Sequence, residues 1–243
     1  MSTPRAAIVV EETQYGRLTM LFIDRFDAGR RLAAKLAHVR GRNAVVLALP
    51  RGGVPVGYEI ARLLDVPLDL VLVRKIGAPG QPELAIGAVA EGDPPELVVD
   101  ERLLAALAVP ADYLEAAQKR ALDEIRRRRA VYLGGRSRAP LRGRVTILVD
   151  DGIATGATML AAMRAVRRQA PHRIVLAVPV AAPESLRHLG GEADETICLQ
   201  TPLEFAAVGQ FYRAFPQLSD PEVTDLLDRA VRFGGGPSSE AAP

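Results

Sequence analysis

Several residue types that would point to a particular class of protein are scarce in this chain. Tryptophan is absent, and the 243 residues include a single cysteine, Cys198, which excludes an intrachain disulfide framework and fits a reducing compartment. The three histidines, His38, His172 and His188, lack metal-ligand spacing. No apolar run approaches the ~20 residues that span a bilayer. A membrane partner is therefore not expected.

An excess of one charge is also missing. Lys and Arg number 31 against 29 Asp and Glu, so the net charge is +2, and the pI of 8.9 reflects a small excess near balance. Nucleic acid is therefore not expected as a partner. Near the N-terminus a short apolar run is followed at once by Glu11 and Glu12, unlike a signal peptide. Cytoplasm is the expected location.

The length and composition predict one α/β domain with a sizeable core. Apolar residues make up 49% and charged residues 25%, as in ordinary globular proteins. We expect an N-terminal extension over 1–21 and a domain over 22–233. The core of this domain would cover about 22–200, and a C-terminal hood and tail segment 201–233. The remainder, 234–243, is rich in Gly, Pro and Ser and is predicted to be disordered.

Strand-like and helix-like segments alternate along the domain. Continuous Val, Ile and Leu runs predict strands buried on both faces, over Val45–Leu49, Leu68–Val73, Val145–Val149, Ile174–Val180 and Thr196–Leu199. Periodic segments predict helices, over Asp24–Arg40, Pro55–Leu64, Asp112–Tyr132, Ala157–Ala170 and Pro183–Leu189. The alternation predicts a mainly parallel central sheet flanked by helices. Ligands of such sheets bind beyond the carboxyl ends of the strands.

The residues after Val145–Val149 carry the strongest functional pattern. Asp150 and Asp151 come first, then Gly152–Thr158 (GIATGAT) and a helix. Adjacent carboxylates at a strand end can hold ribose hydroxyls and, through water, Mg²⁺. The glycines permit a tight turn, and successive N–H groups at a helix start can hold a phosphate. A simple acidic cap and turn would not explain strand, acid pair, Thr-Gly-x-Thr and helix in one register.

This pattern resembles the type I phosphoribosyltransferases, whose signature is a hydrophobic strand, two acidic residues and a Thr-Gly loop. The matching run here is Val149–Thr158 (VDDGIATGAT). The opening Asp24–Ala33 and the turn Pro50–Gly53 (PRGG) are similar to those of a bacterial group of predicted phosphoribosyltransferases. The resemblance implies the type I phosphoribosyltransferase fold with a small variable hood, and it implies a homodimer.

The resemblance also implies roles for the acid pair and its loop. Asp150 and Asp151 would bind the ribose hydroxyls of phosphoribosyl pyrophosphate as catalytic residues and hold Mg²⁺ through water. The 5-phosphate of that substrate would be held by the loop residues Ala154, Thr155, Gly156, Ala157 and Thr158.

Two further groups of residues acquire roles in the same way. Arg51, Gly52 and Gly53 would surround the diphosphate. Arg74 and Lys75, after the second predicted strand, would be catalytic cations that stabilise the charge of the leaving diphosphate. Taken without the resemblance, an ordinary turn and a solvated cation pair are the competing interpretations.

Three other segments leave alternatives open. Ile76–Pro95 carries four Gly and four Pro and has the composition of a lid, or of a structural β-hairpin, and the two are compatible. Phe205, Phe211 or Tyr212 could stack on a base or anchor the tail. Arg126–Arg129 is expected to be a solvated helix segment or a subunit contact, because four consecutive helical residues do not share a face.

The expected function is Mg²⁺-dependent transfer of the 5-phosphoribosyl group to a nitrogenous base or related acceptor, with release of diphosphate. Ala154 stands where 6-oxopurine enzymes usually carry Asp, which weakens a hypoxanthine–guanine assignment. Two alternatives stay open: a nucleotide- or RNA-binding regulator of the same fold with little or no catalysis, and hydrolysis of phosphoribosyl compounds.

Overall fold

A six-stranded parallel sheet lies at the centre of the computed structural model, which describes residues 7–10 and 21–234. Its strand order is β1-β9-β8-β7-β2-β3. The strands are β1 (Ala7–Val10), β2 (Ala44–Ala48), β3 (Leu68–Leu70), β7 (Val145–Val149), β8 (Arg173–Val180) and β9 (Glu195–Gln200). Each neighbouring pair runs parallel, which confirms the α/β fold class with a parallel central sheet.

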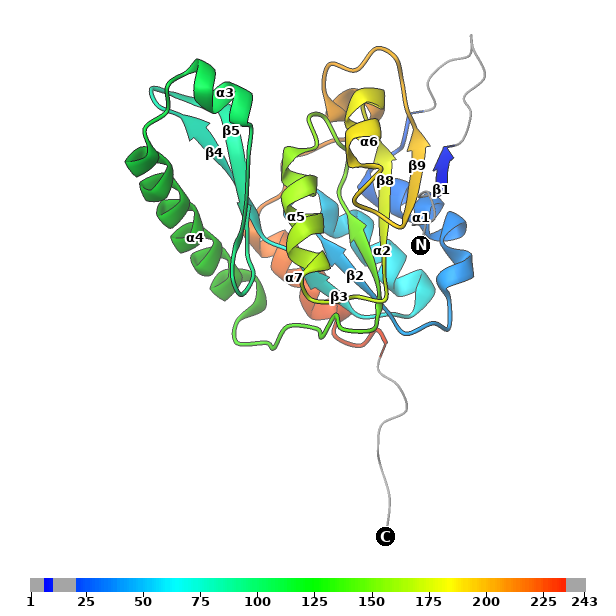
Figure 1. The fold of residues 1–243 in the computed structure, drawn as a ribbon. Helices are drawn as coiled ribbons and strands as arrows, with labels where there is room; N and C mark the ends of the chain where they lie inside the picture. Colours follow the sequence, from blue (N-terminus) through cyan, green and yellow to red (C-terminus); the bar gives the residue numbers. More distant parts are fainter. Residues whose placement is uncertain (1–6, 11–20, 235–243) are drawn as a thin grey trace, which may run out of the picture.

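Helices cover both faces of this sheet (Figure 1). α1 (Arg25–Lys35) and α2 (Gly53–Leu64) pack on one face, and α5 (Ala157–Arg167) and α6 (Pro183–Leu189) on the other. Alternate strand residues point into the two cores, with Val46, Ile147 and Val175 toward α1 and α2, and Leu47, Leu148 and Leu176 toward α5 and α6. Burial on both faces is why these strands read as continuous apolar runs.

A second unit stands beside the main sheet, at the left of Figure 1. It contains a three-stranded antiparallel sheet of β4 (Val73–Ala78), β5 (Gln81–Ala90) and β6 (Glu96–Val99), followed by α3 (Glu101–Ala106) and α4 (Ala111–Leu133). Of the two alternatives for Ile76–Pro95, the structure shows the β-hairpin, because most of this segment lies in the antiparallel pair of β4 and β5. The glycines serve close backbone approach: a Cβ on Gly77 would lie 2.4 Å from the Pro82 carbonyl oxygen.

The segment that follows β9 contacts both the main sheet with its helices and the second unit. It contains the 3₁₀ helix η2 (Val208–Phe211) and the helix α7 (Asp220–Ala230), neither of which the sequence predicted. α7 packs against α2 and α4. Across the described ranges 7–10 and 21–234, no helix combines the length and the hydropathy needed to traverse a bilayer.

Several predicted boundaries shift in the structure. The helix expected over Asp24–Arg40 ends at Lys35 and is followed by the short 3₁₀ helix η1 (Ala37–Val39). Part of the expected N-terminal extension is strand β1, which pairs with β9 at the edge of the sheet. The expected disordered tail lies outside the described residues except for its first residue, Gly234.

A buried carboxylate ties the second unit to the main sheet. Glu91, at the end of β5, accepts hydrogen bonds from the Leu72 amide (3.1 Å), from Arg129 Nη1 (2.7 and 2.8 Å to the two oxygens) and from Arg138 Nη2 (2.6 Å). A buried charge of this kind is tolerated only when paired and hydrogen-bonded. Arg129 therefore has a structural role.

The packing of α1 on α2 depends on Gly29. A Cβ at this position would lie 2.6 Å from the Val56 carbonyl oxygen and 2.9 Å from Glu59 Cβ. Gly29→Val should lower the free energy of unfolding by about 1–3 kcal/mol, the usual cost of overpacking. Gly135→Val is the matched control, because a Cβ there meets nothing within 4 Å. Urea unfolding of both variants checks this, and equal stabilities would contradict it.

Candidate functional site

The turn after β2 and the acid pair after β7 lie against each other at the carboxyl edge of the sheet. The Leu49 amide donates to the Val149 carbonyl oxygen at 2.9 Å. A Cβ on Gly53 would lie 2.7 Å from that same oxygen, and a Cβ on Gly52 would lie 2.0 Å from Asp151 Oδ2. Gly52 therefore leaves the space that the Asp151 carboxylate occupies, and Gly53 lets the turn approach the backbone at the end of β7.

The predicted phosphate loop leads directly into α5. Gly156 has a φ of +80° and precedes a helix start at which no side chain accepts the first amides. These N–H groups, together with the helix dipole, are available to an anion. Ser185 Oγ donates to the Ala154 carbonyl oxygen, and the Ile153 amide donates to Val180 at 2.9 Å, so the loop is held on β8 and α6. Ala154 and Thr155 are exposed at its tip.

Arg25, on α1, is the main partner of the acid pair. Its Nε donates to Asp151 Oδ2 at 2.8 Å, and its Nη1 donates to the Pro216 carbonyl oxygen at 2.8 Å. Its guanidinium carbon lies 3.7 Å from the centre of the Phe215 ring, within the range of a cation–π interaction. Tyr212 Oη donates to the Asp151 carbonyl oxygen at 2.6 Å. The C-terminal segment is thus fastened to the acid pair.

The two carboxylates differ in their electrostatic environments. Burial and the negative charge of Asp151 raise the pKa of Asp150 well above its usual value. Burial also raises the pKa of Asp151, but the Arg25 guanidinium opposes this rise. Asp150 Oδ1 accepts the Asp151 amide at 2.8 Å. Asp150 is therefore the member of the pair that holds a proton more tightly.

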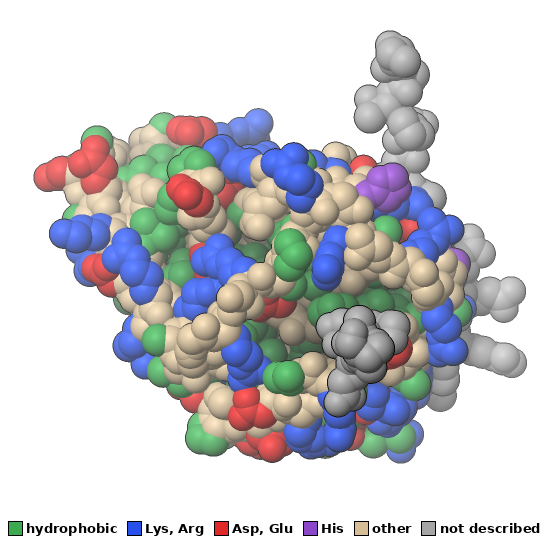
Figure 2. Space-filling model, turned by 90° about the horizontal axis from the view of Figure 1, so that it is seen from below, with side chains coloured by type: hydrophobic (Ala, Val, Ile, Leu, Met, Phe, Trp, Pro, Cys, Tyr) green, Lys and Arg blue, Asp and Glu red, His purple; other side chains and the backbone are tan. Residues whose placement is uncertain are grey.

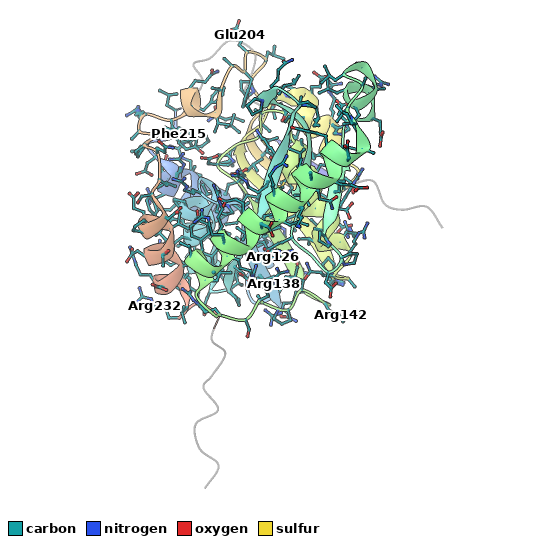
Figure 3. The ribbon with its side chains drawn as sticks, turned by 90° about the vertical axis from the view of Figure 1, so that its left-hand side faces the viewer. Arg126, Arg138, Arg142, Glu204, Phe215 and Arg232 are labelled. Atoms are coloured by element: carbon teal, nitrogen blue, oxygen red, sulfur yellow. The ribbon has the colours of Figure 1, made fainter. Side chains whose placement is uncertain are left out.

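A cavity of about 540 Å³ opens beside the acid pair. Its lining comes from α1, the turn after β2, the loop after β7, α4 and the C-terminal segment. The lining residues are Arg25, Arg51, Gly52, Arg128, Asp151, Val208, Phe215, Pro216, Gln217 and Leu218. Phe215 lies on the chain that joins the hood residues around Glu204 to α7 (Figure 3). Residues of the segment 201–233, which was predicted to contain the hood, therefore form part of the cavity wall.

The structure brings together some of the predicted site residues. Asp151, Arg51 and Gly52 line one cavity. Arg74 and Lys75 lie on β4, paired with Val89 and Ala88 of β5, and neither is among the residues that line this cavity. The predicted strand Leu68–Val73 divides into β3 and the start of β4, so these two residues lie within β4 and do not follow a strand.

The aromatic residues of the C-terminal segment also differ in position: some lie in the core, and one lines the cavity. Phe211 and Tyr212 are buried in the core, and Phe205 packs on Phe211 with ring centres 5.3 Å apart. Their anchoring role is the one that the structure shows. Phe215 lines the cavity instead, with Arg25 on its ring and Tyr212 at a centre distance of 4.9 Å.

Sequence reasoning missed Arg25 and Arg128. Arg25 stands within Asp24–Ala33, the opening that carries part of the family resemblance, so a signal existed. Arg128 belongs to the run Arg126–Arg129, whose members pair with Asp123, Glu124 and Glu91. On the face shown in Figure 2, basic side chains are interspersed with acidic ones. Pairing with these carboxylates offsets part of the positive charge of the run.

The donor chemistry for a metal ion is limited. Within ranges 7–10 and 21–234, no group of three or more His, Cys, Asp or Glu side chains converges as a metal cage. Asp150 and Asp151 alone suit Mg²⁺, which keeps several waters and binds through one or two carboxylates together with substrate phosphates. The residues present fit that mode of binding.

A parallel sheet whose carboxyl edge presents an acid pair beside an open helix N-terminus is an arrangement that suits an anionic ligand. The phosphoribosyl transferase domain family matches residues 22–213, and this chain belongs to that family.

Two similar proteins support this assignment. A Mycobacterium tuberculosis protein provisionally named a phosphoribosyl transferase is 48% identical over 212 residues, which cover 87% of this chain. The match covers 47% of that protein, so the chain spans about half the length of its curated relatives. The crystal structure of TT1426 from Thermus thermophilus is 47% identical, with a TM-score of 0.72, covering 86% of this chain and 98% of that one.

The raised pKa of Asp150 has a consequence for stability. The folded chain binds this proton more tightly than the unfolded chain, so stability falls as the pH rises from 3.8 through the raised value. Asp150→Asn removes the charge and keeps the acceptor for the Asp151 amide. We expect it to raise the free energy of unfolding at pH 7 by about 1 kcal/mol, and by less at pH 4.

Thermal unfolding in EDTA at the two pH values measures this difference. Asp225→Asn is the matched control, because that carboxylate is exposed on α7. Destabilisation of Asp150→Asn at pH 7 would contradict the assignment of the buried charge.

Proposed function

We propose that this chain transfers the 5-phosphoribosyl group of phosphoribosyl pyrophosphate to a nitrogenous base or related acceptor and releases diphosphate. The observation that carries the proposal is the close approach of the Asp151 carboxylate to Gly52, in the loop that leads to the uncapped N-terminus of α5. A sugar with a phosphate on C5 and a diphosphate on C1 needs two anion sites on either side of a diol site. The acid pair stands between two such candidates.

In this proposal, each group of residues binds a different part of the substrate. The amides at the start of α5, from Thr155 to Thr158, hold the 5-phosphate. Asp150 and Asp151 accept hydrogen bonds from the ribose hydroxyls. Such a substrate would compete with Arg25 for Asp151 Oδ2, which now accepts the Arg25 Nε at 2.8 Å. Gly52 and Arg51 face the diphosphate.

The reaction exchanges one bond at C1 of the ribose for another. The C1–O bond breaks and its electron pair leaves with diphosphate, while a lone pair of the acceptor nitrogen forms the C1–N bond. The acceptor then loses the proton that this nitrogen carried. The chain contributes by positioning the two reactants and by stabilising the charge that develops on the diphosphate.

Mg²⁺ is the expected cofactor. When bound, it would neutralise diphosphate charge, with Asp150 and Asp151 holding its water ligands. Arg25 already offsets part of the negative charge of the acid pair, because it forms an ion pair with Asp151. This favours contact between the two carboxylates and Mg²⁺ through water.

The acceptor would enter beneath the C-terminal segment, where Val208, Phe215 and Pro216 line the cavity. Ala154 offers no carboxylate, and its carbonyl oxygen already accepts from Ser185. An acceptor that needs a carboxylate there to take a proton is therefore not favoured. The RNA-binding alternative gains no support from Arg126–Arg129, and the expected homodimer stays a prediction.

Calorimetric titration of phosphoribosyl pyrophosphate with Mg²⁺ tests the proposal. We expect the wild type to bind at about micromolar affinity, about −8 kcal/mol. The double variant Asp150→Asn/Asp151→Asn should bind at least about 100-fold more weakly, because it loses charge-assisted hydrogen bonds to the ribose.

Asp225→Asn, which changes the same kind of charge on an exposed helix face, should bind as the wild type does. A folded wild type that fails to bind would overturn the proposal, as would a double variant with unchanged affinity. Diphosphate release without any acceptor would favour the hydrolytic alternative.

A further inference from the structure

Three guanidinium groups from separate elements line the cavity. Arg25 comes from α1, Arg51 from the turn after β2 and Arg128 from α4 of the second unit. Asp151 is the single carboxylate in the lining, among the described residues. The charge balance of the cavity wall is therefore positive, which suits a ligand with several negative charges.

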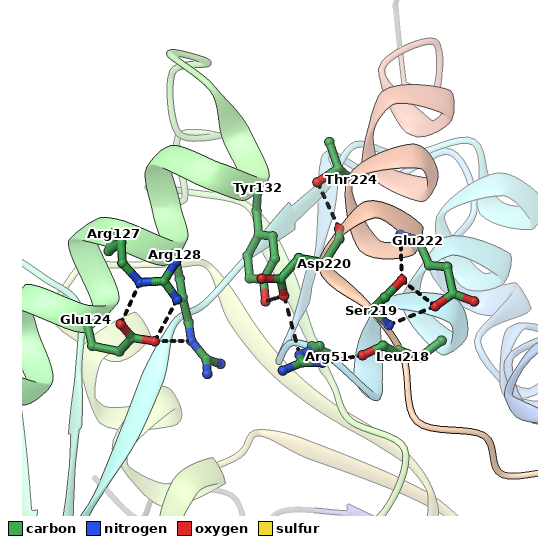
Figure 4. Close-up of polar contacts among 10 residues, drawn as sticks. All are labelled: Arg51, Glu124, Arg127, Arg128, Tyr132, Leu218, Ser219, Asp220, Glu222 and Thr224. Carbon is green, nitrogen blue, oxygen red and sulfur yellow. Dashed lines mark hydrogen bonds and ion pairs between the residues drawn. The ribbon is translucent and has the colours of Figure 1, made fainter.

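Two of these arginines are bound to the protein through their tips. Arg25 donates to Asp151 and to Pro216 and lies on Phe215. Arg51 donates through Nη1 to the Leu218 carbonyl oxygen, and its Nε lies 3.4 Å from Asp220 Oδ1. Figure 4 shows Arg51 held in this way beneath α7.

Arg128 is attached differently. Its Nε donates to Glu124 Oε1 at 2.8 Å, one helical turn earlier on α4. Within the described residues, its two terminal nitrogens have no hydrogen-bond partner. In Figure 4 the tip of Arg128 extends beyond Glu124, and Tyr132 lies between Arg128 and Arg51. The two terminal nitrogens of Arg128, which lines the cavity, are therefore available as hydrogen-bond donors to a ligand.

The neighbours of Arg128 on α4 do not share this orientation. The side chain of Arg128 is 21% exposed, against 73% for Arg126 and 57% for Arg127. Arg127 occupies both oxygens of Glu124. Hydrogen bonds from Arg127 and Arg128 lower the pKa of Glu124 to about 2, so this anchor stays ionised at neutral pH.

We propose that Arg128 binds the diphosphate of phosphoribosyl pyrophosphate, across the cavity from Arg51 and Gly52, and that Glu124 positions it. This inference rests on the proposed function. The two terminal nitrogens match two oxygens of a phosphate group, as bidentate arginine contacts do. Arg128 thereby supplies the cation that the sequence had assigned to Arg74 and Lys75. Its positive charge stabilises the charge that develops on the diphosphate as the C1–O bond breaks.

Calorimetric titration with inorganic diphosphate and Mg²⁺ measures this contact. Arg128→Gln should weaken binding by about 10-fold to 100-fold, the effect of losing charge-assisted hydrogen bonds. Arg126→Gln is the matched control on the same helix and should stay within about twofold of the wild type. Arg128→Lys keeps the charge without the two terminal nitrogens, and should weaken binding by about fivefold.

The role of Glu124 is tested by a double-mutant cycle. Glu124→Gln should weaken diphosphate binding by about threefold when Arg128 is present, and should have no effect in the Arg128→Gln background. A merely structural role would give the same change in both backgrounds, and that result would overturn the positioning role.

The outcomes separate this inference from the proposed function. A wild type that binds phosphoribosyl pyrophosphate through Asp150 and Asp151, combined with unchanged diphosphate affinity in Arg128→Gln, would overturn the inference alone. A wild type that binds neither compound would overturn the proposed function as well. If Arg128→Gln does not fold, Arg128→Lys decides, and wild-type affinity in that variant would contradict the bidentate contact.

Discussion

The close approach of the Gly52 turn to the Asp151 carboxylate is the constraint on which the site depends. It exists because β2 and β7 are neighbours in the sheet, so their carboxyl ends deliver the turn and the acid pair to one place. A side chain at Gly52 would occupy the position of the carboxylate itself. In the proposed function, the same closeness places the acid pair between two regions that would hold phosphate groups.

The charges around this contact connect the two units of the chain. Arg25 balances part of the acid pair and also fastens the C-terminal segment through Phe215 and Pro216. Arg128 reaches the cavity from α4, whose position is fixed by the pairing of Arg129 with Glu91. The cavity is therefore built by elements that are distant in the sequence, and its positive wall is a product of tertiary structure.

The sequence predicted the central sheet well, because strands buried on both faces leave continuous apolar runs that turn residues interrupt. The strand Val145–Val149 has the predicted bounds. The second unit was harder to predict, because Gly77 indicates a loop by composition but serves close strand packing in the structure. The local pattern identified the acid pair. Arg128 could not be assigned in this way, because its contact with the cavity depends on how α4 packs, and a run of four arginines carries no sign of which one turns inward.

A crystal structure of the chain with Mg²⁺ and phosphoribosyl pyrophosphate tests the central claim most directly. The account predicts the 5-phosphate within hydrogen-bond distance of the amides at the start of α5, and the ribose hydroxyls on Asp150 and Asp151. An ordered ligand that binds away from the carboxyl edge of β7, or whose ribose turns away from the acid pair, would contradict it.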